Sequence, residues 1–328
     1  MQSESTEIHE ECCRGPRVTS LLEHFEAVSS GQKQVPLKKV LADQRFLDQS
    51  DTLNKYHNLF QKNLGAMYKH YIASVPYMLE EQCRMGVALA QFNEKFSHGP
   101  ALFGTFYESC SADGPNARTL AEFTRGKIRT LTDSPNPSNA TNFHSLCSHN
   151  YSKFNLGLFA DITPAYIASR PELSEFQNGF DFIHENTTFQ FFSKKRKEYV
   201  GYMCPLLKED GLFFFTEKLM QADHRHYMDR EHAKDKYFKS RYFTDQMIAA
   251  KKEDFLRTME ACQVTLEELV EGISYHFETI YMVWNSGNFY ELAASNNKDR
   301  LEAYVGSLVA PFVPDCLRFD EPMVRRLK

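Results

Sequence analysis

Residues 103–114 read Phe-Gly-Thr-Phe-Tyr-Glu-Ser-Cys-Ser-Ala-Asp-Gly, and this stretch is the most informative part of the chain. A short apolar run ends in an acid, Glu108, and small residues then stand at every second position, at Cys110, Ala112 and Gly114. Small side chains at this spacing let the backbone pass close under a ligand and begin a helix against it. The stretch therefore predicts a buried strand, a tight turn that contacts a ligand, and a helix, in that order.

The residues that follow continue this pattern. A helix is expected over residues 117–123 with Gly126 just past its end, and an alternating strand over residues 127–133 ends in Asp133. This acid lies about 20 residues beyond the turn, where dinucleotide-type folds place the carboxylate that binds ribose hydroxyls. The spacing thus predicts a nucleotide-binding βαβ unit.

Three more apolar runs, at residues 156–161, 180–185 and 211–217, each end in an acidic residue. Segments of helical length separate them, so the five candidate strands predict a doubly wound parallel sheet. In such sheets ligands bind beyond the carboxyl ends of the strands, and these acids are expected to collect there.

The last two candidate strands, residues 277–284 and 289–294, are joined by Asn-Ser-Gly-Asn, which is hairpin chemistry. A parallel sheet that ends in an antiparallel hairpin resembles the class I S-adenosylmethionine-dependent methyltransferases, whereas a dinucleotide dehydrogenase would continue with another βαβ unit. The resemblance covers roughly residues 100–295. It implies an α/β fold: a doubly wound, Rossmann-like, mostly parallel seven-stranded sheet with an antiparallel last strand, plus an N-terminal helical lid.

The same resemblance implies S-adenosylmethionine as the cofactor and assigns its binding residues. Around the first strand these are Glu108, Ser109, Cys110, Ala112 and Gly114. After the later strands they are Asp133, Ser134, Asp161, Ile162, Glu185 and Asn186. In this assignment the Asp133 carboxylate accepts hydrogen bonds from both ribose hydroxyls. His184 and Glu185 are the candidate catalytic residues, with one of them as general base if the acceptor must lose a proton.

Two short segments, residues 186–191 and 216–219, are similar to segments of the carboxy-S-adenosylmethionine synthases, and the similarity continues through residues 248–252 and Trp284. The arginine with which those enzymes hold the transferred carboxyl group aligns with Lys252. Lysine is a point charge and cannot form the bidentate pair of a guanidinium with a carboxylate. We therefore interpret the similarity as shared architecture more than shared reaction.

The rest of the chain divides into flanking segments. Residues 1–18 are polar and are expected to form a disordered tail, and residues 19–99 are expected to form a helical cap. The cap either packs on the edge of the sheet or closes as a lid over the cofactor, and we favour the lid. Residues 296–328 predict a C-terminal helix and tail.

A helical insertion is expected over residues 225–269, within the domain that spans residues 100–295. It is rich in aromatic and basic side chains, which suit the wall of a pocket for a small substrate. The candidate substrate residues are Tyr227, Arg241, Tyr242 and Trp284. In the alternative interpretation the segment is an ordinary amphipathic helix.

Composition limits the function further. The chain has 328 residues, a formal net charge of −5 and no long block of like charges, which argues against a nucleic-acid partner. No apolar run is long enough to span a bilayer, and the N-terminus lacks a signal-peptide core, so a cytoplasmic location without membrane contact is expected. The eight cysteines show no regular spacing and predict neither a metal site nor a disulfide framework. A homodimer is compatible with the sequence.

Two functional hypotheses remain open at this stage. The first is a methyltransferase that transfers a methyl group to a small-molecule acceptor, in a biosynthetic pathway. The second is a protein that resembles carboxy-S-adenosylmethionine synthase, or an RNA-associated protein that binds adenosylmethionine without catalysis. Binding of the cofactor without turnover of any acceptor would favour the non-catalytic form of the second hypothesis, because a fold alone does not fix a function.

Overall fold

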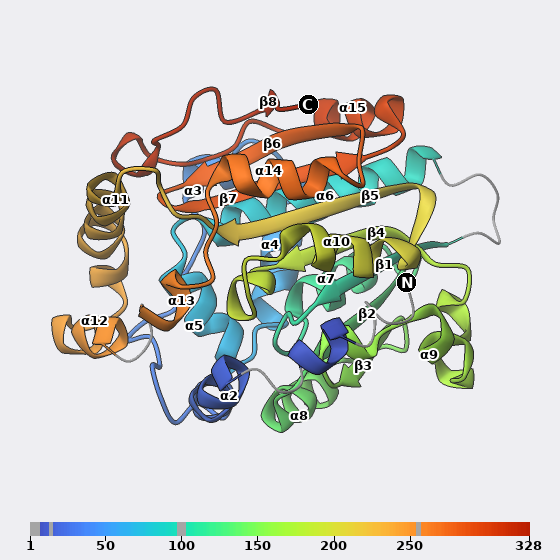
Figure 1. The fold of residues 1–328 in the computed structure, drawn as a ribbon, viewed down its shortest axis with the longest axis horizontal. Helices are drawn as coiled ribbons and strands as arrows, with labels where there is room; N and C mark the ends of the chain where they lie inside the picture. The colour runs from blue at the N-terminus through green and yellow to red at the C-terminus, as the bar shows by residue number, and fades with distance from the viewer. Residues whose placement is uncertain (1–6, 13–15, 97–102, 254–256) are drawn as a thin grey trace.

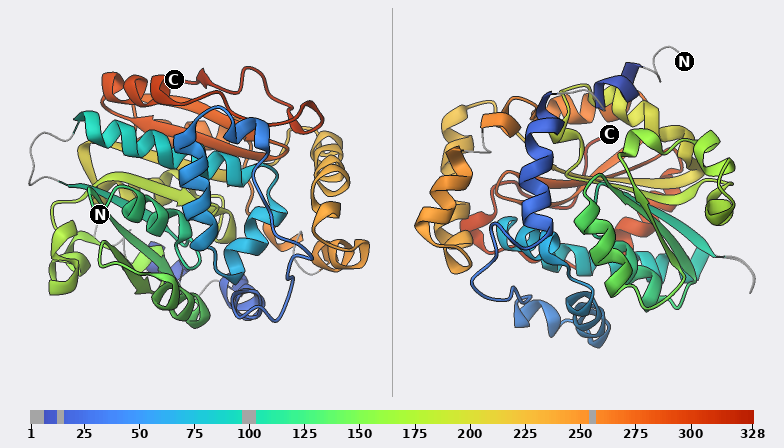
Figure 2. Two further views of the ribbon diagram at one scale, coloured as in Figure 1. Left: turned by 180° about the vertical axis from the view of Figure 1, so that it is seen from behind. Right: turned by 90° about the horizontal axis from the view of Figure 1, so that it is seen from below.

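The computed structural model describes residues 7–12, 16–96, 103–253 and 257–328. They form one eight-stranded sheet, in the order β3-β2-β1-β4-β5-β7-β6-β8, with helices on both faces (Figures 1 and 2). The strands are β1 (Gly104–Ser109), β2 (Ile128–Ser134), β3 (Ser152–Leu156), β4 (Phe180–Asn186), β5 (Leu207–Lys218), β6 (Thr279–Ser286), β7 (Phe289–Ser295) and β8 (Arg325–Arg326).

The helices fall into three groups along the chain. The first group precedes the sheet: α2 (Pro16–Ser29), α3 (Gln44–Leu47), α4 (Asp51–Lys62), α5 (Ala66–Ser74) and α6 (Met78–Phe96). The second alternates with the parallel strands: α7 (Pro115–Phe123), α8 (Pro137–Leu146), α9 (Pro164–Ala168) and α10 (Arg196–Met203). The third follows β5: α11 (His224–Tyr237), α12 (Asp245–Lys251), α13 (Arg257–Glu260), α14 (Leu266–Ser274) and α15 (Lys298–Ser307). No helix in the described part of the chain is both long and apolar enough to cross a lipid bilayer.

The strand directions confirm the predicted Rossmann-like α/β sheet. Strands β1 to β5 pair in parallel, and β7 runs antiparallel between β5 and β6. The hairpin of β6 and β7 turns at Gly287, whose φ of 62° is the left-handed conformation that such turns require. The sequence predicts seven strands, and the structure adds the two-residue strand β8 beside β6.

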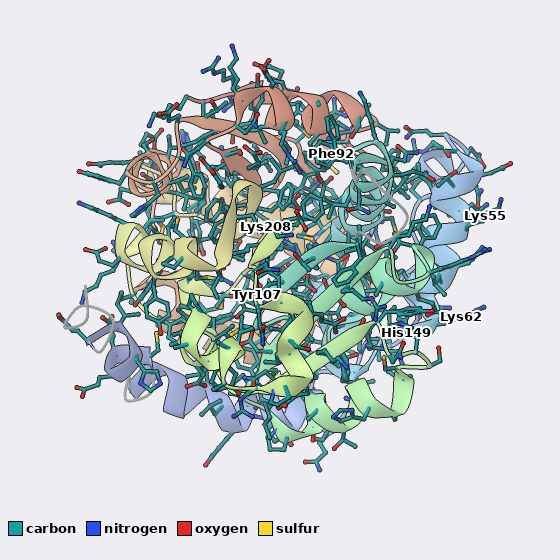
Figure 3. All side chains as sticks on the ribbon, turned by 90° about the vertical axis from the view of Figure 1, so that its right-hand side faces the viewer. Lys55, Lys62, Phe92, Tyr107, His149 and Lys208 are labelled. Atoms are coloured by element: carbon teal, nitrogen blue, oxygen red, sulfur yellow. The ribbon has the colours of Figure 1, made fainter. Side chains whose placement is uncertain are left out.

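Alternate residues of the strands build two separate cores, because successive side chains of a strand point to opposite faces. On one face Tyr107, Ile183 and Phe213 pack in the cluster that α9, α10 and α14 cover. On the other face Phe106 packs with α7, α15 and α6, including Phe92 of α6. Figure 3 shows Phe92 and Tyr107 on their two elements in the interior. The sheet is therefore a rigid platform, buried on both sides, whose strand ends can hold a site.

The helices before β1 are part of the same body. Helix α4 begins at Ser50, whose hydroxyl accepts a 3.1 Å hydrogen bond from the Thr52 N–H. Its apolar face is buried, whereas Lys55 and Lys62 point into solvent (Figure 3). Helix α6 packs directly on the sheet, so it belongs to a helical layer of the sheet as well as to the segment expected to form a cap.

The third strand differs from its predicted position. Residues 156–161 are expected to form it, but β3 is Ser152–Leu156, and Phe159–Asp161 form a turn of 3₁₀-helix. The reason is that β3 lies at the edge of the sheet and has a polar, half-exposed pattern, which carries little apolar signal. The apolar Phe159 is buried in the core from the turn.

The N-terminal segment also differs from expectation where it is described. Residues 7–12 are helical, although a disordered tail is expected over residues 1–18. Ile8 and Cys12 are buried in the core cluster, and His9 Nε2 lies 3.0 Å from Asp161 Oδ1. This helix is held on the fold by two apolar side chains and by polar contacts, including a 2.8 Å ion pair between Glu11 and Lys195.

Candidate functional site

The loop after β1 has a glycine-type backbone although two of its three small residues are not glycine. Cys110, Ala112 and Gly114 all have positive φ angles, of 49°, 56° and 65°. For a residue with a Cβ atom this left-handed conformation costs about 1–2 kcal/mol. A Cβ atom at Gly114 would lie 2.5 Å from Thr132 Cγ2, so this position also requires glycine for space. The loop thus has the shape that the alternating small residues predict.

A buried ion pair holds this loop in place. Asp113 accepts a 2.6 Å hydrogen bond from Arg118 Nη2 and a 3.1 Å bond from the backbone N–H of Gly65. Arg118 also donates to the Asn63 carbonyl at 2.7 Å. Burial raises the pKa of the Asp113 carboxyl to about 6. The loop is therefore joined to the turn between α4 and α5, a connection that the sequence analysis missed.

A cavity of about 200 Å³ lies at the carboxyl ends of the parallel strands. The residues that follow β1, β2, β3 and β4 line it, and they include residues 110–112, 134–136, Leu158 and residues 186–188. Helices α2 and α5, the end of β5, and α11 and α12 also contribute lining residues, as do Asn139, residues 190–192, Met259 and Phe289. This is the position at which doubly wound sheets bind their ligands.

Asn186, at the end of β4, is fixed on this cavity by a network of hydrogen bonds. Its Oδ1 accepts a 2.8 Å bond from the Tyr71 hydroxyl, and its Nδ2 donates to Glu108 Oε1 at 3.0 Å and to the Tyr68 hydroxyl at 3.2 Å. Tyr68 and Tyr71 come from α5 and also line the cavity. Because all of these side chains are held, the edge of the cavity beside β4 is preorganised.

The structure divides the predicted cofactor residues into two groups. Those that line the cavity are Cys110, Ala112, Ser134 and Asn186. Those that lie elsewhere are Glu108, Ser109, Gly114, Asp133, Asp161, Ile162 and Glu185. Glu108 and Ser109 are fully buried next to lining residues, since Glu108 bonds to Asn186 and Ser109 Oγ lies 3.2 Å from Thr188 Oγ1.

Asp133 is enclosed rather than presented to the cavity. Its Oδ1 accepts a 2.9 Å bond from the Tyr107 hydroxyl and a 3.1 Å bond from the Cys110 N–H, and the side chain is fully buried. Burial raises the pKa of this carboxyl to about 7. Asp133 thus supports the loop after β1 from beneath, which differs from the expected contact with a ribose.

Asp161 and Ile162, which the resemblance gives as cofactor-binding residues, also lie away from the cavity. Ile162 is fully buried in the core cluster, and Asp161 accepts a 2.8 Å hydrogen bond from the Leu158 N–H in the turn after β3. The displaced third strand explains this result, because the turn puts Leu158 at the position where Asp161 is expected.

The candidate catalytic residues lie behind the lining of the cavity. His184 is fully buried between strands, with Nε2 2.8 Å from Thr216 Oγ1 and Nδ1 3.3 Å from Glu108 Oε1. Glu185 accepts hydrogen bonds from the backbone N–H groups of Thr188 and Phe189, and burial raises its pKa well above the usual range. Neither side chain lines the cavity, so we assign no proton transfer to them.

The candidate substrate residues likewise lie outside the lining. Trp284 and Tyr227 are fully buried, and Tyr242 is buried in a core cluster with Trp284. Arg241 is exposed, and its Nη1 lies 3.5 Å from the Tyr77 hydroxyl. Aromatic side chains of residues 225–269 pack this insertion against the rest of the fold. This agrees with the alternative interpretation, in which the insertion is an ordinary amphipathic segment.

A group of lysines that the sequence patterns did not predict lies at the end of the cavity beside β5. The lining residues there include Lys218, Lys234, Lys239, Lys251 and Lys252. A signal was present on α11, because Glu231, Lys234 and Asp235 are spaced three and four residues apart and so lie on one face of a helix. We name the five lysines the lysine pocket.

The chain matches no protein family model and no curated protein sequence. Among solved structures, it is similar to the plantazolicin methyltransferase BpumL in complex with SAH, with 9% identity, a TM-score of 0.47, and 89% of this chain and 99% of that chain covered. It is also similar to the cyclopropane synthase MmaA2 from Mycobacterium tuberculosis, with 12% identity, a TM-score of 0.43, and 78% and 75% covered. An O-methyltransferase from Bacillus cereus in complex with SAH has 12% identity and a TM-score of 0.44, with 77% of this chain and 96% of that chain covered. At these values we draw no function from the similarity.

Proposed function

We propose that the protein is an S-adenosylmethionine-dependent methyltransferase that acts on a small-molecule acceptor. One observation carries the proposal: the loop after β1, with left-handed residues 110, 112 and 114, lines a cavity at the carboxyl end of a sheet in which β7 is inserted antiparallel. A backbone of this shape admits the close approach of a ligand that a nucleotide-like cofactor needs.

The residues around the end of β2 fit the polar part of such a cofactor. Asn139 lines the cavity, its side chain is buried, and its Oδ1 has no hydrogen-bond partner among the described residues. Its Nδ2 donates to Ser134 Oγ at 2.9 Å, which fixes the direction of the amide. A buried acceptor without a donor costs free energy unless a ligand supplies one. We therefore assign the ribose hydroxyls to Asn139 and Ser134, in place of Asp133.

Bound S-adenosylmethionine would supply an electrophilic methyl group on a positively charged sulfur. The chain contributes mainly alignment, because Asn186 and the two tyrosines of α5 hold the edge of the cavity in one arrangement. Helices α2 and α5 line the cavity and would exclude water from the reacting atoms.

The alternative resembling carboxy-S-adenosylmethionine synthase finds little support at Lys252. This residue aligns with the arginine that holds the carboxyl group in that family, but its Nζ lies 2.6 Å from Asp235 Oδ2. An ammonium is a point charge and cannot form the bidentate pair that a guanidinium makes with a carboxyl group. Mass spectrometry of the purified protein tests the point, and a bound carboxylated sulfonium compound would favour the alternative.

Isothermal titration calorimetry with S-adenosylmethionine, S-adenosylhomocysteine and NAD tests the proposal itself. We expect saturable binding of the first two and none of NAD. Tight binding of NAD alone, or no binding of either sulfur compound, would contradict it. Binding without methyl transfer to any of a panel of small acceptors would favour the non-catalytic hypothesis.

A further inference from the structure

The end of the cavity farthest from β2 and β3 has an unusual charge. Among its described lining residues, the lysine pocket brings together five ammonium groups, whereas Glu231 and Asp235 are the only acids. The chain as a whole carries a formal charge of −5, so this concentration of positive charge does not follow from the composition. The lysines come from the end of β5, from α11 and α12, and from the turn between these helices, all at the end of the sheet toward which β5 runs (Figure 1).

Each of the two acids is shared by more than one lysine. Glu231 Oε2 lies 2.8 Å from Lys218 Nζ and also contacts Lys234. Asp235 lies 3.5 Å from Lys239 Nζ and 2.6 Å from Lys252 Nζ. Lys218, Lys234 and Lys239 are at most 7% exposed, so water screens their charges only weakly. Two carboxylates therefore cannot neutralise the ammonium groups that surround them.

Lys251, at the end of α12, contacts α5 at this end of the cavity. Its Nζ lies 2.7 Å from His70 Nε2 and 3.1 Å from Ser74 Oγ on α5. His70 Nδ1 lies 3.0 Å from the Gln34 carbonyl oxygen, so Nδ1 carries the proton and Nε2 is a neutral acceptor. Burial and Lys251 lower the pKa of His70 well below its usual range, which agrees with a neutral ring.

The lysines also repel one another. Burial first and then Lys234 lower the pKa of Lys239 to about 8. Burial together with Lys239, Lys234 and Lys218 lowers the pKa of Lys251 well below its usual range. If the lysines served only to neutralise Glu231 and Asp235, one lysine for each acid would suffice. An excess of buried like charge destabilises a fold, and clefts lined by one sign of charge concentrate ligands of the opposite sign.

We propose that the lysine pocket binds the methyl acceptor, and that this acceptor is a small molecule with at least two negative charges on carboxylate or phosphate groups. The inference rests on the proposed methyltransferase function, and it names the substrate class of the same cavity. Cationic amines, which an aromatic insertion would also suit, are excluded by the repulsion of the lysines. The Lys218 ammonium lies 5.2 Å from the Tyr227 ring centroid and 5.9 Å from that of Phe289, and these contacts help to fix its position.

Two substitutions remove pocket charge without leaving an acid unpaired. In Lys218→Gln the Glu231 carboxylate retains Lys234, and in Lys239→Gln the Asp235 carboxylate retains Lys252. Lys236→Gln is the matched control, because Lys236 is exposed on the same helix α11 and does not line the cavity. Removal of a repelling charge should leave thermal stability unchanged or raised, so weaker anion binding in these variants would not reflect unfolding.

The probes are inorganic phosphate and succinate, titrated by calorimetry into protein saturated with S-adenosylhomocysteine, with chloride at equal ionic strength as reference. We expect saturable binding of one or both probes, weakened about tenfold or more in Lys218→Gln and Lys239→Gln and unchanged in Lys236→Gln. Tighter binding of phosphate would identify a phosphorylated acceptor, and tighter binding of succinate a dicarboxylate. Binding no stronger than that of chloride, or an equal loss in Lys236→Gln, would overturn the proposal.

The same experiment separates this inference from the proposed function. If S-adenosylhomocysteine binds and no anion binds specifically, the proposal of an anionic acceptor is wrong and the proposed methyltransferase function is unaffected. Failure of S-adenosylhomocysteine to bind, with specific anion binding in the protein alone, would leave an anion site and remove the methyltransferase, and with it the assignment of the anion as methyl acceptor.

Discussion

Arg118 Nη2 lies 2.6 Å from Asp113 Oδ2, and both side chains are completely buried beneath the loop that follows β1. The pair joins this loop to the turn before α5 through Asn63 and Gly65. Loss of one partner of a buried pair leaves an uncompensated charge in the interior. We expect Arg118→Met to lower the free energy of unfolding by about 3–5 kcal/mol, measured by urea denaturation.

The exposed pair of Arg45 and Asp43 provides the control for this variant. Arg45 is 74% exposed, and surface ion pairs contribute at most about 1 kcal/mol. Arg45→Met should therefore change the free energy of unfolding by less than that amount. An equally small effect of Arg118→Met would mean that the buried pair does not hold the loop.

The second prediction concerns the left-handed residues of the loop. Ala112 adopts a φ of 56°, which glycine tolerates without the cost of about 1–2 kcal/mol that a Cβ atom brings. Ala112→Gly should be neutral or stabilising by up to about 1 kcal/mol, since the greater freedom of glycine in the unfolded chain offsets part of the gain. Ala117→Gly, the same change inside helix α7, should destabilise by about 1 kcal/mol. Equal losses of stability in both variants would contradict the backbone strain at Ala112.

The third prediction follows from the raised pKa of Asp133. Its carboxyl has a pKa of about 7 in the folded protein and 3.8 as its ordinary value, with burial as the main cause. Between these values the folded state binds more protons than the unfolded state, so stability falls as pH rises from about 4 to 7. Asp113 and Glu80, with pKa values raised to about 6 and 7, act in the same direction.

Asp133→Asn should remove one contribution to this slope. The amide oxygen can still accept the bonds from Tyr107 and the Cys110 N–H, so at pH 8 the variant should be more stable than the parent by roughly 1–4 kcal/mol. At pH 4 the two proteins should be similar. Asp43→Asn is the opposite control, because hydrogen bonds from Arg45 lower the pKa of that carboxyl and the variant should lose stability at pH 8. Urea denaturation at both pH values measures the differences.

The fourth prediction tests which residue holds the ribose. If Asn139 Oδ1 accepts a ribose hydroxyl, Asn139→Ala should weaken S-adenosylhomocysteine about 2- to 12-fold, the value of one neutral hydrogen bond of 0.5–1.5 kcal/mol. Asp133→Asn should leave this affinity nearly unchanged, because Asp133 is enclosed by Tyr107 and Cys110. If calorimetry shows a larger loss of affinity in Asp133→Asn than in Asn139→Ala, Asp133 binds the ribose. The Cys110 peptide would then have to move when the ligand binds.

The sheet was predictable because its signals are local and strong. Strand β5 contains the continuous apolar run at residues 212–215, β1 and β4 each contain a short apolar run before an acid, and the turn at Gly287 indicates the hairpin of β6 and β7. Strand β3 was misplaced because an edge strand needs few apolar residues, whereas the apolar Phe159 belongs to a turn. An apolar sequence pattern indicates which residues are buried. At β3 the strand residues are half-exposed and the buried Phe159 lies outside the strand, so the pattern indicates the wrong segment.

The site was harder to predict, because an acid at a strand end can point away from the ligand. Asp133 has the expected sequence position but hydrogen-bonds beneath the loop. Asn139, one turn into α8, and the lysine pocket depend on contacts between segments far apart in the chain, as the 2.7 Å contact of Lys251 with His70 illustrates. The spacing of Glu231, Lys234 and Asp235 indicates one face of α11, but no spacing within a single segment places Asn139 or the rest of the lysine pocket at the cavity.

The last prediction concerns the helices that cover the cavity. Residues 19–99 are expected from the sequence to form a helical cap that closes as a lid, and in the structure α5 and α2 line the cavity whereas α6 packs on the sheet. Helix α2 contacts several elements: the Ser138 N–H donates a 3.2 Å bond to Glu26, the Asn142 side chain donates a 3.0 Å bond to the Ser29 carbonyl, and the ring of Phe25 lies 5.2 Å from that of Phe191. Because α2 and α5 line the cavity, they are the helices expected to respond to a ligand.

A bound cofactor would add surface against which α2 and α5 pack. Amide exchange over residues 16–29 and 66–74 should then slow when S-adenosylhomocysteine binds, and exchange in α15, which packs on the far edge of the sheet, should not change. Phe25→Ala should weaken the protection of α2, whereas Leu37→Ala, at a side chain that is 64% exposed, should not. Equal protection of α2 and α5 with and without the ligand would show that these helices are fixed walls and that the cofactor enters without their movement.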